Sequence, residues 1–243
     1  MLQQVLLSVF IFALVPLVIK QTSATVITIC LFRLSVTVIV LSIFWRQKIS
    51  FKTYFSFSRS RARLWVIGII FFLHWITYAY AVKIGGAGVA VLGMSTYGLQ
   101  LMIASALFLG HRITRKDLFC LVLAFVGLFL IFPTWNLHHA TTKGLLLGLV
   151  SATCFALLPI LHKFSDDIST EMRIFAQFFG ALLCFLFLAG EAEWNLTHSD
   201  WWGLLFLAIF GTLLAHGLWA KISSTLSPGI TGLAYYSIAP MTI

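Results

Sequence analysis

The chain has 243 residues, of which 60% are hydrophobic and 9% are charged, and its formal net charge is +9. Soluble domains carry about 25% charged residues, so this composition excludes a water-soluble protein and predicts an integral membrane protein that contacts the lipid bilayer. The basic residues lie mostly in short hydrophilic gaps, where they indicate membrane orientation, and no nucleic-acid partner is expected.

Nine apolar runs follow one another along the chain. A membrane-spanning helix needs about 20 mostly apolar residues, so the pattern predicts an all-α membrane protein, a polytopic helical bundle of nine helices. The runs cover residues 2–19, 24–44, 64–82, 87–109, 118–132, 144–161, 174–189, 202–219 and 230–243.

Lysine and arginine concentrate in the even-numbered gaps between these runs. The odd gaps hold little beyond Lys20, Lys83 and Lys143, and the seventh gap is acidic. Cytoplasmic loops carry an excess of basic residues, so we expect the even gaps and the N-terminus to be cytoplasmic, in a bacterial inner membrane. The cations of the even gaps are Arg46, Lys48, Lys52, Arg59, Arg61, Arg63, Arg112, Arg115, Lys116, Lys163 and Arg173.

A nine-residue stretch occurs twice, at an offset of 143 positions. Residues 12–20 read F-A-L-V-P-L-V-I-K, and residues 155–163 read F-A-L-L-P-I-L-H-K. The first run thus corresponds to the sixth, so one repeat holds five helices. An odd number of helices inverts the second copy, as in many secondary transporters. We therefore expect two inverted repeats, over residues 1–133 and 143–243.

The counterpart of the fifth run would fall near residues 261–275, whereas the printed sequence stops at residue 243. We therefore expect the second repeat to be truncated in its fourth helix, with the tenth helix missing.

These features resemble a known family. A lysine ends the first run, Arg33 lies inside the second, and residues 109–114 read L-G-H-R-I-T. Together with the duplicated five-helix halves, this resembles the EamA branch of the drug/metabolite transporter superfamily, whose pattern there is roughly L-G-E-x-[LI]-[ST]. His111 stands where glutamate is usual, and helix 1 lacks the expected aromatic–small pair before its lysine. The resemblance covers the whole chain and implies a transporter.

Arg33 lies near the centre of the second run. A central arginine costs at least ~2.5–3.5 kcal/mol on insertion scales, so we expect it to face the bundle or a water-filled cavity. At the offset of 143 its counterpart is Ala176. Contact with a solute and a structural anchor on backbone carbonyls are both open interpretations.

The acidic residues bear on the solute. All seven lie in gaps or at helix edges, whereas a carrier of organic cations generally needs a carboxylate within the membrane. A neutral, zwitterionic or anionic small-molecule solute is therefore expected rather than a cationic one. Arg33 and the helix-end lysines Lys20 and Lys163 are candidate partners for a carboxylate, and the lysines are equally well explained as anchors.

His74 and His216 lie deep in the third and eighth runs, 142 positions apart. Histidine titrates near physiological pH, so the pair is a candidate proton relay; a neutral histidine bonded between helices is the alternative. We expect a substrate cavity at mid-membrane, lined by polar and aromatic residues. Its candidate residues are Arg33, His74, Trp75, Ser95, Thr96, Tyr97, Gln100, His216, Tyr235, Tyr236 and Ser237.

Other residues are given structural roles. Tyr78, Tyr80 and Trp219 lie near run ends and are expected at a membrane interface. Small residues such as Gly85, Gly93 and Gly211 favour close helix packing. Helix kinks are predicted at Pro16, Pro159 and Pro240.

The sequence contains no motif of catalysis: there is no Walker loop, nucleophile elbow or paired carboxylate. The four cysteines lie in apolar runs without CxxC spacing, which favours small buried hydrophobes. We therefore expect no enzyme activity, cofactor, disulfide or metal site.

The favoured function is a secondary-active exporter of amino acids or related small metabolites, working by alternating access between inverted repeats. A non-transporting truncated membrane protein or structural subunit is the alternative, and a multidrug cation exporter is a weaker one. The sequence specifies neither the coupling ion nor an oligomeric state.

Overall fold

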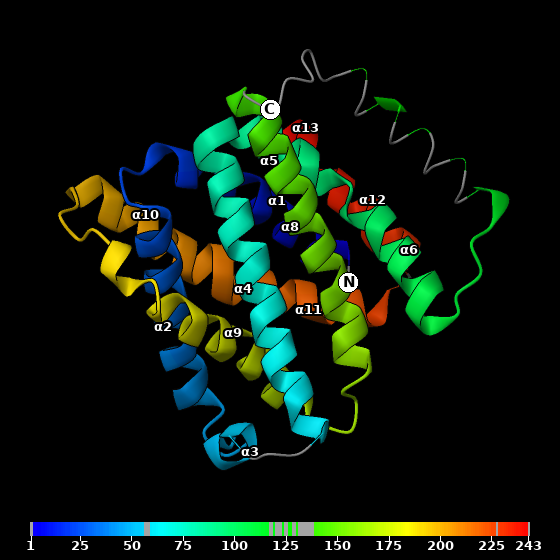
Figure 1. Ribbon diagram of the computed structural model, residues 1–243, viewed down its shortest axis with the longest axis horizontal. Coiled ribbons are helices and arrows are strands. Elements are labelled where there is room, and N and C mark those ends of the chain that lie inside the picture. Colours follow the sequence, from blue (N-terminus) through cyan, green and yellow to red (C-terminus); the bar gives the residue numbers. More distant parts are fainter. Residues whose placement is uncertain are drawn as a thin grey trace.

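The computed structural model describes residues 2–55, 59–116, 139–226 and 228–242, together with residues 119, 123, 126, 127 and 130. In this part of the chain the regular elements are helices, packed as one bundle (Figure 1). The all-α prediction is therefore confirmed. The fifth predicted run, residues 118–132, falls largely outside the described residues.

The helices agree with the other predicted runs. Six of the described helical segments are long and apolar enough to cross a membrane. The elements in chain order are α1 (Leu2–Gln21), α2 (Val26–Phe44), α3 (Phe51–Phe55), α4 (Arg59–Gly85), α5 (Ala87–Ser95), α6 (Tyr97–Leu109), α8 (Ala140–Lys163), α9 (Thr170–Leu186), the 3-10 turn η1 (Ala189–Glu191), α10 (His198–Ala208), the π-helical η2 (Ile209–Leu214), α11 (Ala215–Thr225), α12 (Pro228–Tyr236) and α13 (Ile238–Thr242).

Several helices begin at a hydroxyl residue because its side chain satisfies a free backbone N–H of the first turn. Thr25 accepts from Thr28 N before α2, and Ser169 accepts from Met172 N before α9. At α10, Thr197 and Asp200 form a reciprocal capping box.

One end of the bundle is joined by hydrogen bonds around Asp200, and we call it the Asp200 face. The Asp200 carboxylate accepts from the Thr22 and Ser23 hydroxyls, each at 2.7 Å. The Lys83 ammonium, at the end of α4, donates to the carbonyl of Thr22. The α1–α2 link, the end of α4 and the start of α10 therefore meet at this face.

The opposite end is joined by ion pairs, and we call it the Arg63 face. Arg63, at the start of α4, pairs with Asp167 of the α8–α9 link at 2.9 Å. Lys48, just after α2, pairs with Glu171 of α9 at 2.6 Å. These groups belong to the second and sixth gaps, both of which are predicted to lie on one side of the membrane.

The two faces establish the direction of the repeats. Helix α1 ends beside Thr22 on the Asp200 face, whereas α8 ends beside Asp167 on the Arg63 face. The two copies of the repeated nine-residue stretch thus run in opposite directions across the bundle. The inverted arrangement that the odd helix count predicted is confirmed.

Glycines bring the helices close together. A Cβ atom built on Gly98 of α6 would lie 2.6 Å from the Gly232 Cα of α12. A Cβ on Gly68 of α4 would lie 2.6 Å from the Gly180 Cα of α9. Backbones can approach this closely only where side chains are absent, as is common between membrane helices.

The fourth and ninth predicted helices are interrupted at corresponding positions. Helix α5 passes into α6 at Thr96, whose N–H bonds to Gly93 O at 3.3 Å. Helix α12 passes into α13 at Ser237, whose N–H bonds to Ala234 O at 3.3 Å. Broken helices at matching positions of two repeats are typical of binding sites in transporters.

Candidate functional site

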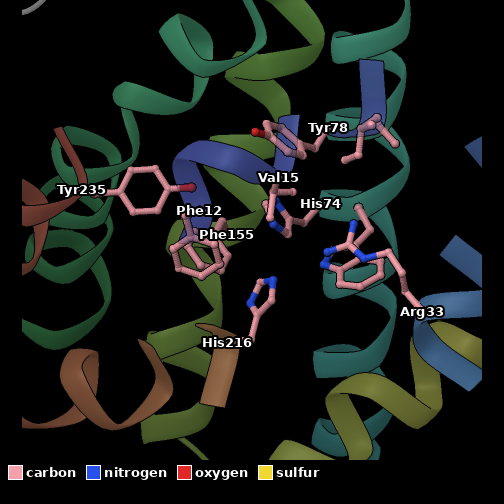
Figure 2. Close-up of a pocket in the computed structure, with 11 residues that line it drawn as sticks. Phe12, Val15, Arg33, His74, Tyr78, Phe155, His216 and Tyr235 are labelled. Carbon is pink, nitrogen blue, oxygen red and sulfur yellow. The ribbon is translucent and has the colours of Figure 1, made fainter. Parts of the chain in front are cut away.

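A small cavity lies in the middle of the bundle, between the two halves of the chain (Figure 2). Its volume is about 30 Å³, which is room for only a few water molecules. The lining residues come from α1, α2, α4, α8, α11 and α12: Phe12, Val15, Ile19, Arg33, His74, Trp75, Tyr78, Ala79, Phe155, His216 and Tyr235.

Arg33 forms one wall of this cavity. Its side chain is 4% exposed. Its Nε donates to Thr212 Oγ1 at 3.0 Å, and its guanidinium carbon lies 4.1 Å from the centre of the Trp75 ring. A cation over an indole face is attracted by the ring quadrupole. The guanidinium is therefore held along one edge and across one face.

Thr212 lies in the π-helical turn η2, between α10 and α11. Its hydroxyl donates to Leu207 O, five residues earlier, at 2.8 Å. A hydroxyl has a single proton, which Thr212 donates to Leu207. The same hydroxyl oxygen therefore accepts the hydrogen bond from Arg33 Nε. π-Helical turns occur frequently at functional sites.

His74 of α4 is hydrogen-bonded to Ser151 of α8. The Ser151 hydroxyl donates to His74 O at 2.9 Å and lies 2.8 Å from the imidazole Nδ1, while Ser151 O lies 3.1 Å from the same nitrogen. The counterpart of Ser151 at the offset of 143 is Ser8, which donates to Val5 of its own helix. Ser151 therefore joins the two halves, whereas Ser8 bonds within its own helix.

His216 is surrounded by rings. Its imidazole centre lies 5.1 Å from Phe12, 5.6 Å from Phe71 and 6.1 Å from Phe155. Phe71 and Phe155 also contact the His74 ring, at 5.9 and 4.6 Å. The two histidines thus share aromatic neighbours on one cavity.

Tyr235 lies on the side of the cavity opposite Arg33 (Figure 2). Its ring packs against Tyr97 at 4.8 Å and against Trp219 at 5.3 Å. The cavity is therefore charged at one end and aromatic at the other.

Comparison with known proteins identifies the family of this bundle. The sequence pattern of the EamA-like transporter family matches residues 2–132 and, separately, residues 142–243. The chain belongs to the EamA-like transporter family. It is therefore an integral membrane protein of a transporter family, built from two copies of the family unit.

Two similar proteins agree with this membership. An uncharacterized transporter from Archaeoglobus fulgidus is 24% identical to this EamA-like chain over 194 residues, which are 66% of the chain and 68% of the relative. A protein of known crystal structure superposes with a TM-score of 0.69 at 16% identity, over 99% of this chain and 84% of the other. The second likeness shows the fold.

The structure of this EamA-like protein brings part of the predicted site together. The predicted residues that line the cavity are Arg33, His74, Trp75, His216 and Tyr235. Those outside its lining are Ser95, Thr96, Tyr97, Gln100, Tyr236 and Ser237. Of these, Tyr97 packs against the lining residues Phe155 and Tyr235, at 4.8 Å each.

The residues outside the lining have local roles. The Ser95 hydroxyl donates to Val91 O at 2.8 Å and the Thr96 hydroxyl to Gly93 O at 2.7 Å. Gln100 Nε2 donates to Thr96 Oγ1 at 2.7 Å. Tyr97 is fully buried as a packing residue, and Ser237 is exposed. These groups stabilise the break between α5 and α6 and mark the one between α12 and α13.

Some cavity residues were not expected there. Tyr78 was assigned to a membrane interface, but it lines the cavity because it is one helical turn from His74 on the same face of α4. Trp219 is also buried, at 3% exposure. Phe12 and Phe155 are the first residues of the two repeated stretches, and their symmetric positions could have identified them.

The predicted prolines lie within helices. Pro16 and Pro159 are inside α1 and α8, and both helices continue past them to their lysines. Pro240 is in the short helix α13, after the interruption at Ser237. Kinking at these prolines stays a prediction.

Proposed function

We propose that this protein is a secondary-active transporter that exports amino acids or related small metabolites by alternating access between its inverted repeats. One observation carries the proposal: the cavity has walls from both halves. Phe12, Arg33 and His74 come from the first half, and Phe155, His216 and Tyr235 come from the second. A site between repeats is where rocking of one half against the other changes access.

The cavity's small volume supports an occluded conformation. An amino acid does not fit in about 30 Å³. A solute therefore enters only after the halves separate at one face. The Asp200 network and the ion pairs of the Arg63 face each join the two halves, so each is a candidate gate.

The charge of the cavity supports the solute class. Its described lining residues include Arg33 and two histidines but no acidic residue. A neutral, zwitterionic or anionic solute therefore has a lower electrostatic barrier than a cation does. His74 and His216 are the proposed proton-coupling groups, because they are titratable side chains within a cavity that both halves form.

The proposed orientation places the Arg63 face in the cytoplasm of a bacterial inner membrane. Arg63 and Lys48 lie at this face, and basic residues concentrate on the cytoplasmic side. Helix α1 ends on the other face, so the N-terminus is cytoplasmic in this orientation.

Uptake into proteoliposomes tests the function. We expect uptake of some amino acids or related metabolites, and we expect it to depend on a pH gradient. Protein-free liposomes and liposomes with Arg112→Gln, a charge loss at an exposed residue, are the controls. Uptake of lipophilic cations alone would favour a multidrug exporter, and no uptake of any solute would favour a non-transporting subunit.

Replacement of His74 by Gln and of His216 by Phe tests the coupling. We expect uptake to lose its dependence on the pH gradient while exchange of solute across the membrane persists. A pH-independent rate in the unmodified protein would exclude both histidines as coupling groups.

A further inference from the structure

Arg33 carries a charge that the described residues do not neutralise. Six of the seven acidic residues are described, and those six lie at helix ends or in links. Among the described residues, ion pairs join Lys48 to Glu171 and Arg63 to Asp167. A buried ion without a counter-charge is strongly destabilising. The position of Arg33 on a cavity therefore favours a counter-ion that comes from outside the protein.

The guanidinium is already oriented for such a ligand. Thr212 occupies its Nε, and Trp75 covers one face. The edge that carries Nη1 and Nη2 is thus the one left for a ligand. A Cβ atom built on Gly211 would lie 2.9 Å from Val15 Cγ2 and 3.7 Å from Nη2, so this glycine lies beside the Nη edge. Two parallel N–H groups on one edge match the two oxygens of a carboxylate.

The internal repeat shows that this arrangement occurs at one of two corresponding helix interfaces. At the offset of 143, Gly211 corresponds to Gly68, and Arg33 corresponds to Ala176. A Cβ on Gly68 would lie 2.6 Å from Gly180 Cα and 3.1 Å from Ala176 O. The second copy of this helix interface is therefore closed by backbone contact. The first copy instead contains an arginine and a π-helical turn.

The other lining residues determine which kind of ligand, apart from its charged group, the cavity favours. Beyond Arg33 its walls include Phe12, Val15, Phe155 and Tyr235. These are apolar or aromatic groups, which favour an apolar body by area burial and ring contacts. Among the described lining residues, an ammonium group on the ligand would meet ring faces, imidazoles and hydroxyls but no carboxylate.

We infer that the Nη edge of Arg33 binds the carboxylate of the transported solute, an organic monocarboxylate with an apolar or aromatic body. The inference rests on the proposed function and names the chemical group that the site recognises. Recognition requires the carboxylate and not an amino group. Thr212 and Trp75 are positioning residues that fix the guanidinium.

Binding of four small molecules to the purified protein tests this. They share one aromatic body: 3-phenylpropionate, its amide 3-phenylpropanamide, phenylalanine and phenethylamine. We expect the two carboxylates to bind, as measured by calorimetry and by ligand-induced thermal stabilisation, and the amide and the amine to bind at least about tenfold more weakly.

Variants locate the binding. Arg33→Lys keeps the charge but loses the planar fork, so we expect about tenfold weaker binding of 3-phenylpropionate. Arg33→Gln should abolish the preference for carboxylate over amide. Thr212→Val leaves Arg33 in place and frees its Nε, so it should reduce that preference even if the Arg33 variants do not fold. Arg112→Gln is the matched control and should bind as the unmodified protein does.

The outcomes separate this inference from the proposed function. Equal binding of amide and carboxylate, or an unchanged preference in Thr212→Val and Arg33→Gln, would overturn the carboxylate site. Uptake of amides or amines without carboxylates would also overturn it and would leave transport intact. Selective binding of carboxylates without uptake would support the site and contradict the transporter.

Discussion

Asp200 shows how one side chain can join the two halves. Its carboxylate accepts hydrogen bonds from the Thr22 and Ser23 hydroxyls, from Ser23 N, and from the Thr197 hydroxyl and N–H, at 2.7 to 3.1 Å. Hydrogen bonds to an ionised acceptor are the strong ones. Both oxygens of the charged Asp200 carboxylate therefore accept hydrogen bonds at this face.

Replacement of Asp200 by Asn should destabilise the protein by about 2–3 kcal/mol, because an amide NH₂ would face hydroxyl and N–H donors. Reversible unfolding in mixed detergent micelles measures the free energy. Glu193→Gln is the control, since that side chain is exposed and only the Glu193 backbone bonds to Thr28. Equal losses in both variants would contradict the assignment.

The sequence predicted those site residues whose side chains are unusual within an apolar run. Arg33 and His74 were predicted because polar groups are costly at mid-membrane, and both lie on the cavity. Ser151 and Thr212 were not predicted, because a hydroxyl in an apolar run is common and its partner lies 77 or 179 positions away. Such partners follow from packing, which one sequence does not specify.

At the scale of helices, close packing depends on pairs of glycines. Gly98 and Gly232 meet where α6 crosses α12, beside the interruptions at Thr96 and Ser237. The contact joins the two broken helices of the repeats. A side chain at this crossing would push the helices apart.

Gly98→Ala should therefore destabilise the protein by about 1–3 kcal/mol, as overpacking does, because its Cβ would lie 2.6 Å from Gly232 Cα. Gly217→Ala, in α11, is the matched control. A Cβ there meets nothing within 4 Å, so helix propensity should make it neutral or stabilising by up to about 1 kcal/mol. Thermal midpoints in detergent measure both, and the same sign for both changes would refute the packing account.

The first turn of α9 offers a pH-dependent contact outside the apolar run. The hydrogen bond from Lys48 lowers the pKa of Glu171 below its ordinary value of 4.5. A lowered pKa means that the ion pair stabilises the fold above pH 4.5 and that this contribution is lost as the pH falls through the lowered value. Lys48 is 59% exposed, so screening limits the effect to below about 1 kcal/mol.

Glu171→Gln should thus lower the free energy of unfolding by less than about 1 kcal/mol at pH 7 in low salt. The difference should vanish in about 1 M salt or at strongly acidic pH. Denaturation curves at two pH values and two salt concentrations measure it. A difference that grows on acidification would contradict the sign.

At the scale of the whole molecule, the repeat explains the architecture. The offset of 143 predicted the inversion, and α1 and α8 indeed end on opposite faces. The interruptions at Thr96 and Ser237 lie 141 positions apart, close to this period. The period showed that Arg33 corresponds to Ala176. It could not predict which neighbours the arginine contacts, because those contacts arise from tertiary packing.

Under the proposed alternating access, transport requires one of the two faces to open. Ser23, in the first half, contacts Asp200, in the second half, at 2.7 Å, and Thr197, in the second half, contacts the same carboxylate at 2.7 Å. Cysteines at positions 23 and 200 would connect the halves, whereas cysteines at 197 and 200 would connect two residues within one half. Both double variants replace Asp200, so they differ only in whether position 23 or position 197 carries the second cysteine.

We expect oxidation of the Ser23→Cys, Asp200→Cys protein to abolish uptake into proteoliposomes, because the Asp200 face can no longer separate. Reductant should restore the rate that this variant has before oxidation. The Thr197→Cys, Asp200→Cys protein should transport equally well when oxidised and reduced, since its disulfide spans no moving interface. Unchanged uptake with the halves cross-linked, verified by mass spectrometry of the disulfide, would exclude opening of this face from the cycle.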